Sequence, residues 1–210
     1  MSIMYHVGKL LCIMVFKTIF RRKILGRKNF PKGGAIIASN HASYLDPPVV
    51  GSAAPQEMYY LARESLFQRF FLGWLYRKVS AIPIRTDAAD MKSIKTILSI
   101  LKQGKKILLF PEGTRTMDGE LQKARRGIGY ILCKAKVPVI PTYVHGTFEA
   151  LPRHRHVPHF PKIVVSFGKP MYFDDICSES PSKKDYDLIG KRIMKRIAEL
   201  KSEVLQMYGN

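Results

Sequence analysis

The chain has 210 residues, enough for one domain with a full hydrophobic core and too few for two comfortable ones. With 35 lysines and arginines against 16 acidic residues, its formal net charge of +19 favours anionic partners such as nucleic acid, an anionic membrane surface or phosphorylated small molecules. The sequence carries no zinc-finger spacing, RNA-recognition aromatic block or helix-turn-helix signature, which argues against nucleic acid.

Residues 3–20 are mostly apolar, and a cluster of cations follows between positions 21 and 28. A secretory signal carries its positive charge first and a small-residue cleavage site last, so this segment is not one. Lys9 and Lys17 disfavour a membrane-spanning helix, because a lysine at the centre of a bilayer costs about 2.5–3.5 kcal/mol. The pattern favours a helix that lies in the membrane interface, with spanning the membrane or docking on the domain as alternatives.

Residues 35–38 have the length and β-branched content of a buried strand. His41 follows this strand, and Asp46 stands directly before Pro47 and Pro48, where a helix capped by the aspartate is expected to start. The Asp46 carboxylate can then bind one imidazole nitrogen of His41 and leave the other free as a base. Without a serine nucleophile, such a pair suits a reaction in which the substrate supplies the hydroxyl. The alternative is a plain turn and helix cap, and the spacing alone does not exclude it.

Downstream of this turn, strands and helices alternate. Residues 87–103 form an amphipathic helix that starts at Asp87 or Asp90, ends at Gly104, and connects strand-like residues 80–84 and 107–110. Strand, helix and strand in this order imply parallel pairing. Further strands are predicted at residues 58–61, 137–144 and 163–167, and further helices at residues 48–53, 66–76, 125–135 and 185–207. The predicted fold class is a single α/β domain with a central, mostly parallel sheet flanked by helices, plus the N-terminal helix.

The turn from Pro111 to Arg115 follows a second strand-like run, residues 105–110. At the carboxyl edge of a parallel sheet, the usual ligand edge, it would join His41. Arg115 can bind a phosphate through two parallel hydrogen bonds. Glu112 would repel a phosphate, so it could instead hold an arginine or a substrate hydroxyl. A tight turn that requires glycine is the structural alternative, and both interpretations can hold at once.

Two other features are less specific. His154, His156 and His159 share one loop with two arginines, but no cysteine or carboxylate stands at ligand spacing, so a basic surface loop is favoured over a metal site. The three cysteines are widely separated and form no Cys-x-x-Cys pair. An odd number in this arrangement favours free thiols in a reducing, intracellular compartment over a disulfide framework or a zinc site.

The blocks at residues 40–46 and 110–115 resemble the glycerolipid acyltransferase family, in the family's order. Residues 81–85 and 137–141 are similar to its two remaining motifs, so the resemblance covers the chain from about residue 41 to residue 141. It implies an acyltransferase domain, which we expect over residues 29–210, after the membrane-associating helix that the N-terminal pattern predicts over residues 1–28. It also implies that His41 is the catalytic base and Asp46 its orienter, and that the substrate is bound by Arg85, Glu112, Gly113, Thr114 and Arg115.

The resemblance implies acyl-CoA or acyl-carrier-protein as donor, lysophosphatidate as acceptor and phosphatidate as product, without a bound cofactor or metal. An enzyme of this kind is expected at the cytoplasmic face of a membrane, as a peripheral or monotopic protein. Acylation of glycerol 3-phosphate or another lysolipid is the nearest alternative, because the same base serves any hydroxyl. A non-catalytic, basic membrane-binding protein is a further alternative, and the intact His41, Asp46, Glu112 and Arg115 count against it.

Overall fold

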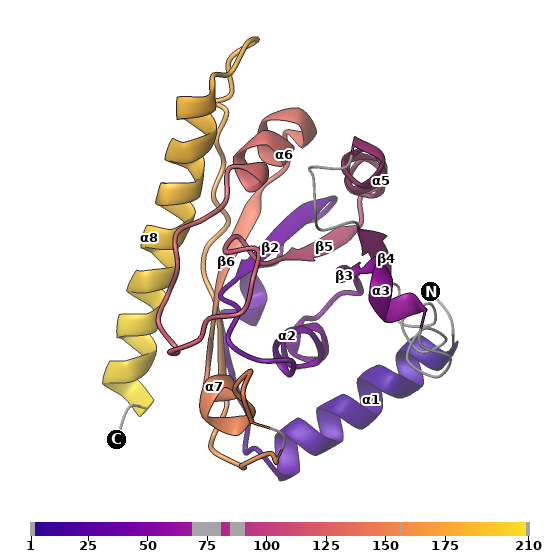
Figure 1. Cartoon of the computed structure of the whole chain (residues 1–210), viewed down its shortest axis with the longest axis vertical. Coiled ribbons are helices and arrows are strands. Elements are labelled where there is room, and N and C mark those ends of the chain that lie inside the picture. The colour runs from indigo at the N-terminus through magenta and orange to yellow at the C-terminus, as the bar shows by residue number, and fades with distance from the viewer. Residues whose placement is uncertain (1–2, 69–80, 85–90, 156, 209–210) are drawn as a thin grey trace.

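A mixed sheet forms the centre of the computed structural model, which describes residues 3–68, 81–84, 91–155 and 157–208 (Figure 1). In these residues the strands are β1 Lys23–Leu25, β2 Ala35–Ser39, β3 Met58–Arg63, β4 Ala81–Ile84, β5 Lys106–Leu109, β6 Val139–His145 and β7 Val164–Phe167. Their order in the sheet is β1-β7-β6-β2-β5-β3-β4, and only the β6–β7 pair is antiparallel. The predicted α/β class with a mostly parallel sheet is therefore confirmed.

Helices cover both faces of this sheet (Figure 1). They are α1 Ile3–Thr18, α2 Asp46–Ala53, α3 Glu64–Phe67, α5 Met91–Lys102, α6 Gly127–Ala135, α7 Thr147–Ala150 and α8 Lys183–Tyr208, and a short 3-10 turn η1 spans Arg27–Asn29. One hydrophobic core joins α5, α6 and α8 to one face of the sheet, and a second core joins α1 and α2 to the other.

The central strands bury side chains on both faces, as parallel strands between two helix layers must. β2 is buried along its whole length. Ile36 and Ala38 enter the core beneath α5, α6 and α8, whereas Ile37 between them enters the core beneath α1 and α2. This alternation follows from the twofold side-chain period of a strand. It fixes the register of β2 and so the place where the following turn leaves the sheet.

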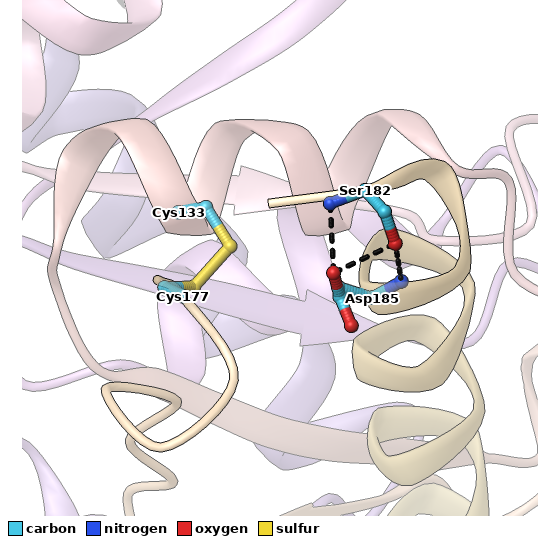
Figure 2. The surroundings of a disulfide bond; sticks show 4 residues. All are labelled: Cys133, Cys177, Ser182 and Asp185. Carbon is cyan, nitrogen blue, oxygen red and sulfur yellow. Dashed lines mark hydrogen bonds between the residues drawn. A yellow bond between two sulfur atoms is a disulfide. The ribbon is translucent and has the colours of Figure 1, made fainter. Parts of the chain in front are cut away.

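Helix α8 confirms the amphipathic pattern of the C-terminal sequence. Its buried apolar residues are Ile189, Ile193, Ile197, Leu200 and Val204. Ser182 and Asp185 form a capping box at its start: the Asp185 carboxylate accepts hydrogen bonds from the Ser182 N–H and hydroxyl, both at 2.7 Å (Figure 2). The Ser182 hydroxyl in turn accepts the Asp185 N–H at 3.3 Å.

Helix α1 packs on α2 with one face and leaves an apolar face exposed. On the packed side, Tyr5 and Phe16 are buried, the Tyr5 hydroxyl accepts the Met58 N–H at 3.2 Å, and Lys9 Nζ donates to Ala54 O at 3.0 Å. Seven apolar residues of α1 are exposed: Ile3, Met4, Val7, Leu10, Leu11, Met14 and Val15. Among the described helices, none combines the length and apolar character needed to cross a bilayer.

Residues 35–38, the first strand predicted from the sequence, are preceded in the structure by another strand of the same sheet. Lys23, Ile24 and Leu25 form β1, which pairs in parallel with β7. Phe20, just before this strand, is buried in the same core as α2. The predicted division at residue 28 remains a prediction, but the segment before it contributes a strand to the sheet.

The expectation of three free thiols is wrong. Cys133 on α6 is bonded to Cys177, which lies in the segment between β7 and α8 (Figure 2). The bond joins residues 44 positions apart, and only Cys12 is a free cysteine. The argument from unpaired cysteines to a reducing compartment therefore loses its basis.

Candidate active site

The candidate site lies where two adjacent central strands end. β2 and β5 run parallel, with Ala38 opposite Leu109. His41 follows β2 and Glu112 follows β5, so both leave the same carboxyl edge of the sheet. Parallel sheets bind their ligands at this edge. The structure thus brings together the two predicted motifs that stand some 70 residues apart in the chain, since the His41 N–H donates to Glu112 Oε1 at 3.1 Å over a separation of 71 residues.

Asn40 holds the exit from β2 in place. Its side-chain Nδ2 donates to Val144 O at 3.0 Å, and its Oδ1 accepts the Val144 N–H at 2.8 Å. The amide therefore continues the β2–β6 ladder by one step after the backbone of β2 has turned away. Its role was not predicted, because it depends on a partner 104 residues away.

The predicted hydrogen bond between His41 and Asp46 is present. His41 Nδ1 lies 2.8 Å from Asp46 Oδ2, with the imidazole 18% exposed and the carboxylate fully buried. The same oxygen accepts the Ala42 N–H at 2.7 Å and the Ser43 N–H at 2.8 Å. Three donors on one oxygen fix the carboxylate and, through it, the orientation of the ring. With Nδ1 committed to Asp46, Nε2 is the nitrogen available for proton transfer.

Asp46 does not cap the next helix in the expected way. It is the first residue of α2, and its carboxylate turns back to the 41–43 turn instead of binding the first N–H groups of the helix. Pro47 and Pro48 follow it in the first turn, as predicted, and their missing N–H groups leave no donor there to satisfy. The helix start is therefore built to present the aspartate to His41.

Two further contacts confine the His41 residue. Its ring stacks on Phe110, with the ring centroids 3.8 Å apart and an angle of 14° between the planes. Its carbonyl oxygen accepts the Thr116 N–H at 2.9 Å. Because Phe110 and Thr116 flank the Pro111–Arg115 turn, this turn holds the base from both sides.

Glu112 supports the base and lies only 3% exposed. Its Oε1 accepts the His41 N–H at 3.1 Å, so this carboxylate holds the main chain where it leaves β2, whereas Oε2 is buried without a hydrogen-bond partner among the described residues. Burial raises the pKa of this carboxyl to about 7, although hydrogen bonds from main-chain N–H groups act in the opposite direction. The negative charge of Glu112 is therefore reduced near neutral pH.

Arg115 reaches the same turn from the other motif. Its guanidinium carbon lies 3.4 Å from the ring centroid of Tyr44, which belongs to the His41–Asp46 turn. Its Nη1 atom is buried and has no hydrogen-bond partner among the described residues. Gly113 has a φ of +69°, a left-handed conformation that favours glycine, and Thr114 between them is half-buried. Arg85, the remaining predicted substrate-binding residue, lies outside the described residues, as does most of the predicted helix at residues 66–76.

The histidine-rich loop contributes none of these residues, although Arg153 at its start lies 3.8 Å from Met117 Sδ through its Nη1 atom. His154, Arg155 and His159 line a cavity of about 530 Å³ beside α7, and none of its described lining residues belongs to the site predicted from the sequence. Phe160 in the cavity wall contacts Phe20, with ring centroids 5.4 Å apart, at the C-terminal end of α1. His156 lies outside the described residues. Within the described part of the chain, no three His, Cys, Asp or Glu side chains are grouped so that they could hold a metal ion.

Comparisons with known proteins agree with this geometry. A family model described as "Acyltransferase" matches residues 21–145. The chain is 28% identical to the 1-acyl-sn-glycerol-3-phosphate acyltransferase of Bacillus subtilis (strain 168) over 187 residues, which are 88% of this chain and 90% of that protein. It is 26% identical to a chloroplastic 1-acyl-sn-glycerol-3-phosphate acyltransferase of Brassica napus, covering 85% of this chain and 54% of that protein.

A solved structure is also similar. It is the crystal structure of the 1-acyl-sn-glycerophosphate (LPA) acyltransferase PlsC from Thermotoga maritima, with a TM-score of 0.74 and 25% sequence identity. The likeness covers 94% of this chain and 79% of that chain. It therefore extends over nearly the whole chain.

Proposed function

Because the chain belongs to the acyltransferase family, we propose that it moves a fatty acyl group to the sn-2 hydroxyl of 1-acyl-sn-glycerol 3-phosphate. The product is phosphatidic acid, and the reaction is a step of phospholipid biosynthesis. The observation that carries the chemistry is the His41–Asp46 pair, whose 2.8 Å contact leaves one imidazole nitrogen to act as a base. The names of the bacterial and plant relatives supply the acceptor.

The reaction needs no nucleophile from the protein. Nε2 of His41 takes the proton of the acceptor hydroxyl as the hydroxyl oxygen attacks the carbonyl carbon of an acyl thioester. A C–O ester bond forms, the C–S bond breaks, and the departing thiolate receives the proton from the imidazolium. The negative charge of Asp46, held by its three hydrogen bonds, stabilises that imidazolium while it lasts.

The substrate phosphate is assigned to the arginines. The guanidinium of Arg115, steadied on the ring of Tyr44, has a buried Nη1 without a partner among the described residues, so it retains donors for an anion. Arg85 is also proposed to bind substrate, and this assignment is supported only by the similarity of residues 81–85 to a motif of the family. Gly113 and Thr114 complete the pocket wall between Glu112 and Arg115. The donor is acyl-CoA or acyl-carrier-protein, both of which present a thioester, and no further cofactor is required.

The enzyme is proposed to bind the cytoplasmic face of a membrane as a peripheral or monotopic protein. The support is the exposed apolar face of α1, from Ile3 to Val15, together with the cations that follow the helix. An apolar helix face with a basic flank suits the interface of an anionic bilayer, where each cation contributes about 1 kcal/mol. Residues 1–28 are the proposed attachment and residues 29–210 the acyltransferase domain, with β1 of the attachment also forming part of the domain's sheet.

Purified protein incubated with a labelled acyl donor and a panel of acceptors tests this proposal. The panel is lysophosphatidate, glycerol 3-phosphate, a choline lysolipid and monoacylglycerol, each offered with acyl-CoA and with acyl-carrier-protein, and the labelled lipids are separated afterwards. We expect labelled phosphatidate from lysophosphatidate, and little product from the other acceptors. If glycerol 3-phosphate alone gives a labelled product, glycerol 3-phosphate is the acceptor in place of lysophosphatidate. If no pair of donor and acceptor gives a labelled ester, the proposed activity is refuted.

A further inference from the structure

Two consecutive arginines precede α6, and the structure gives them different surroundings. Arg126 donates to both carboxylate oxygens of Asp187 on α8, through Nε at 2.9 Å and Nη2 at 2.8 Å. Arg125 is exposed, and no hydrogen bond or ion pair of its guanidinium is found among the described residues. The guanidinium of Arg126 therefore has a structural partner, whereas the N–H donors of the Arg125 guanidinium remain available for a ligand.

The backbone of Arg125 is tied to the candidate site. Its N–H donates to Pro111 O at 2.7 Å, in the turn that also carries Glu112. Its side chain then runs over Gly113: a Cβ atom placed on Gly113 would lie 2.5 Å from Cδ and 2.6 Å from Nε of Arg125. A side chain at position 113 would displace the arginine from this path, so the glycine leaves space for the arginine as well as allowing the left-handed turn.

This placement directs the cation to the substrate edge. Glu112, next to Gly113, accepts the His41 N–H at 3.1 Å, so His41 and Arg125 are both hydrogen-bonded to one short turn. Helix α6 begins two residues after Arg125 with no acidic residue in its first turn, and its positive dipole end adds to the potential there. A guanidinium with free donors at such a place suits a phosphate, because its fork matches two phosphate oxygens.

We propose that Arg125 forms a second phosphate-binding position of the active site, on the outer side of the Gly113 turn, beside the position assigned to Arg115. Its ligand is a phosphate group of one substrate, either the phosphomonoester of the acceptor or a phosphate of the donor's carrier. The proposal rests on the proposed function for the identity of the substrates. It rests on the Pro111 and Gly113 contacts for the position.

Arg125→Ala and Arg126→Ala form a matched pair for the test, since each removes one exposed positive charge from adjacent positions. Equilibrium binding of lysophosphatidate and coenzyme A is measured for both variants and the wild type, with monoacylglycerol and 3′-dephospho-coenzyme A as analogues that lack a phosphate. KM values for acceptor and donor follow in detergent solution. We expect Arg125→Ala to weaken one phosphate-bearing ligand about 10-fold or more, as for the loss of a charged hydrogen bond. Arg125→Lys should recover part of the loss.

Each further outcome of these measurements either identifies the ligand of Arg125 or overturns the proposal. Weaker lysophosphatidate binding with unchanged monoacylglycerol binding assigns Arg125 to the acceptor, and weaker coenzyme A binding assigns it to the donor. Equal affinities in Arg125→Ala, Arg126→Ala and wild type, or a loss of kcat with no change in either affinity, would overturn the proposal. A wild-type protein that binds these ligands but forms no ester would refute the proposed function, while the binding comparison would still decide the role of Arg125.

Discussion

At the scale of single residues, the account depends on the charge of Asp46 as well as on its hydrogen bonds. One oxygen of the carboxylate accepts all three bonds, and the other, Oδ1, is buried without a partner in the described structure. The amide oxygen of an asparagine can take the place of the bonded oxygen. Asp46→Asn therefore separates the orientation of His41 from the stabilisation of its protonated form.

We expect Asp46→Asn to lower kcat, but by less than the roughly 10²- to 10⁴-fold loss expected for His41→Ala. Asp46→Ala should fall below Asp46→Asn, because it removes the hydrogen bonds of the 41–43 turn as well as the charge. Single-turnover rates of the three variants check this order, with circular dichroism to confirm the fold. Full activity in Asp46→Asn would show that its charge has no part in the reaction.

Glu112 predicts a pH-dependent stability. Its folded-state pKa of about 7 lies above the ordinary value of 4.5, so the folded protein binds more protons than the unfolded chain between these pH values. The free energy of unfolding therefore falls as the pH rises through this window. Above the window the carboxyl is ionised in both states, and this loss of stability has reached its full size. Glu112→Gln should be more stable than wild type by up to about 3 kcal/mol at pH 8, and the difference should vanish towards pH 4.

Urea unfolding of Glu112→Gln at several pH values measures this effect. Glu120→Gln is the control, since Glu120 is exposed and pairs only with Lys201 among the described residues. Its substitution should change stability by less than about 1 kcal/mol at any pH. A Glu112→Gln variant that is less stable than wild type at pH 8 would show that the buried carboxylate is better satisfied than its raised pKa implies.

At the scale of elements, α1 is predicted to provide the membrane contact. Leu10 and Leu11 are 57% and 53% exposed, while Tyr5 and Phe16 on the other side hold the helix to the domain. Leu10→Glu with Leu11→Glu should reduce sedimentation with anionic vesicles about 10-fold or more, because two leucines lose a burial worth about 1.5–3 kcal/mol each. Leu188→Glu, at a 45% exposed leucine of α8, is the control and should sediment as wild type does. Unchanged sedimentation of the double variant would place the attachment elsewhere.

This pair of substitutions is a sharper test than removal of residues 1–28. Such a deletion would also remove β1 and Phe20, and an unfolded product would say nothing about the membrane. The substitutions leave the buried side of α1 intact, so a loss of binding can be attributed to the exposed face.

The Cys133–Cys177 bond predicts a stability that depends on reduction. It closes a 44-residue separation and fastens the segment before α8 to α6 (Figure 2). Substitution of both cysteines by serine should lower the free energy of unfolding by roughly 2–4 kcal/mol, and a reducing agent should destabilise the wild type by a similar amount. Cys12→Ser, which leaves the bond intact, is the control. Three titratable thiols in the folded, untreated protein would contradict the pairing.

The elements that the sequence predicted are those whose signal is local. β2 and β5 each contain a short apolar run, α8 repeats its apolar residues at helical spacing, and His41 and Asp46 lie within one turn. β1 was missed because three residues with a basic flank carry no strand pattern. Other omissions are pairings between distant positions: Asn40 with Val144, Arg115 with Tyr44, Arg125 with Gly113, and Cys133 with Cys177. A single sequence shows such residues but not their partners.

At the scale of the whole molecule, charge and architecture serve one reaction. The net charge of +19 attracts a phosphorylated acceptor, a phosphate-bearing donor carrier and an anionic membrane surface alike. The sheet places His41 and the turn proposed to bind phosphate at one edge, and α1 packs on α2, the helix that starts with Asp46 (Figure 1). A lysophosphatidate acceptor that leaves the bilayer would thus find the proposed membrane-binding helix α1 and the proposed base His41 in one protein.

The central claim is that His41 is the base that activates the acceptor hydroxyl. Its most direct test is the rate at which His41→Ala forms labelled phosphatidate from lysophosphatidate and an acyl thioester, compared with wild type at equal concentrations of folded protein. Loss of general-base catalysis is worth about 10²- to 10⁴-fold, so the variant should retain less than about one hundredth of the wild-type rate while binding lysophosphatidate normally. A folded His41→Ala protein that forms phosphatidate at near the wild-type rate would contradict the mechanism.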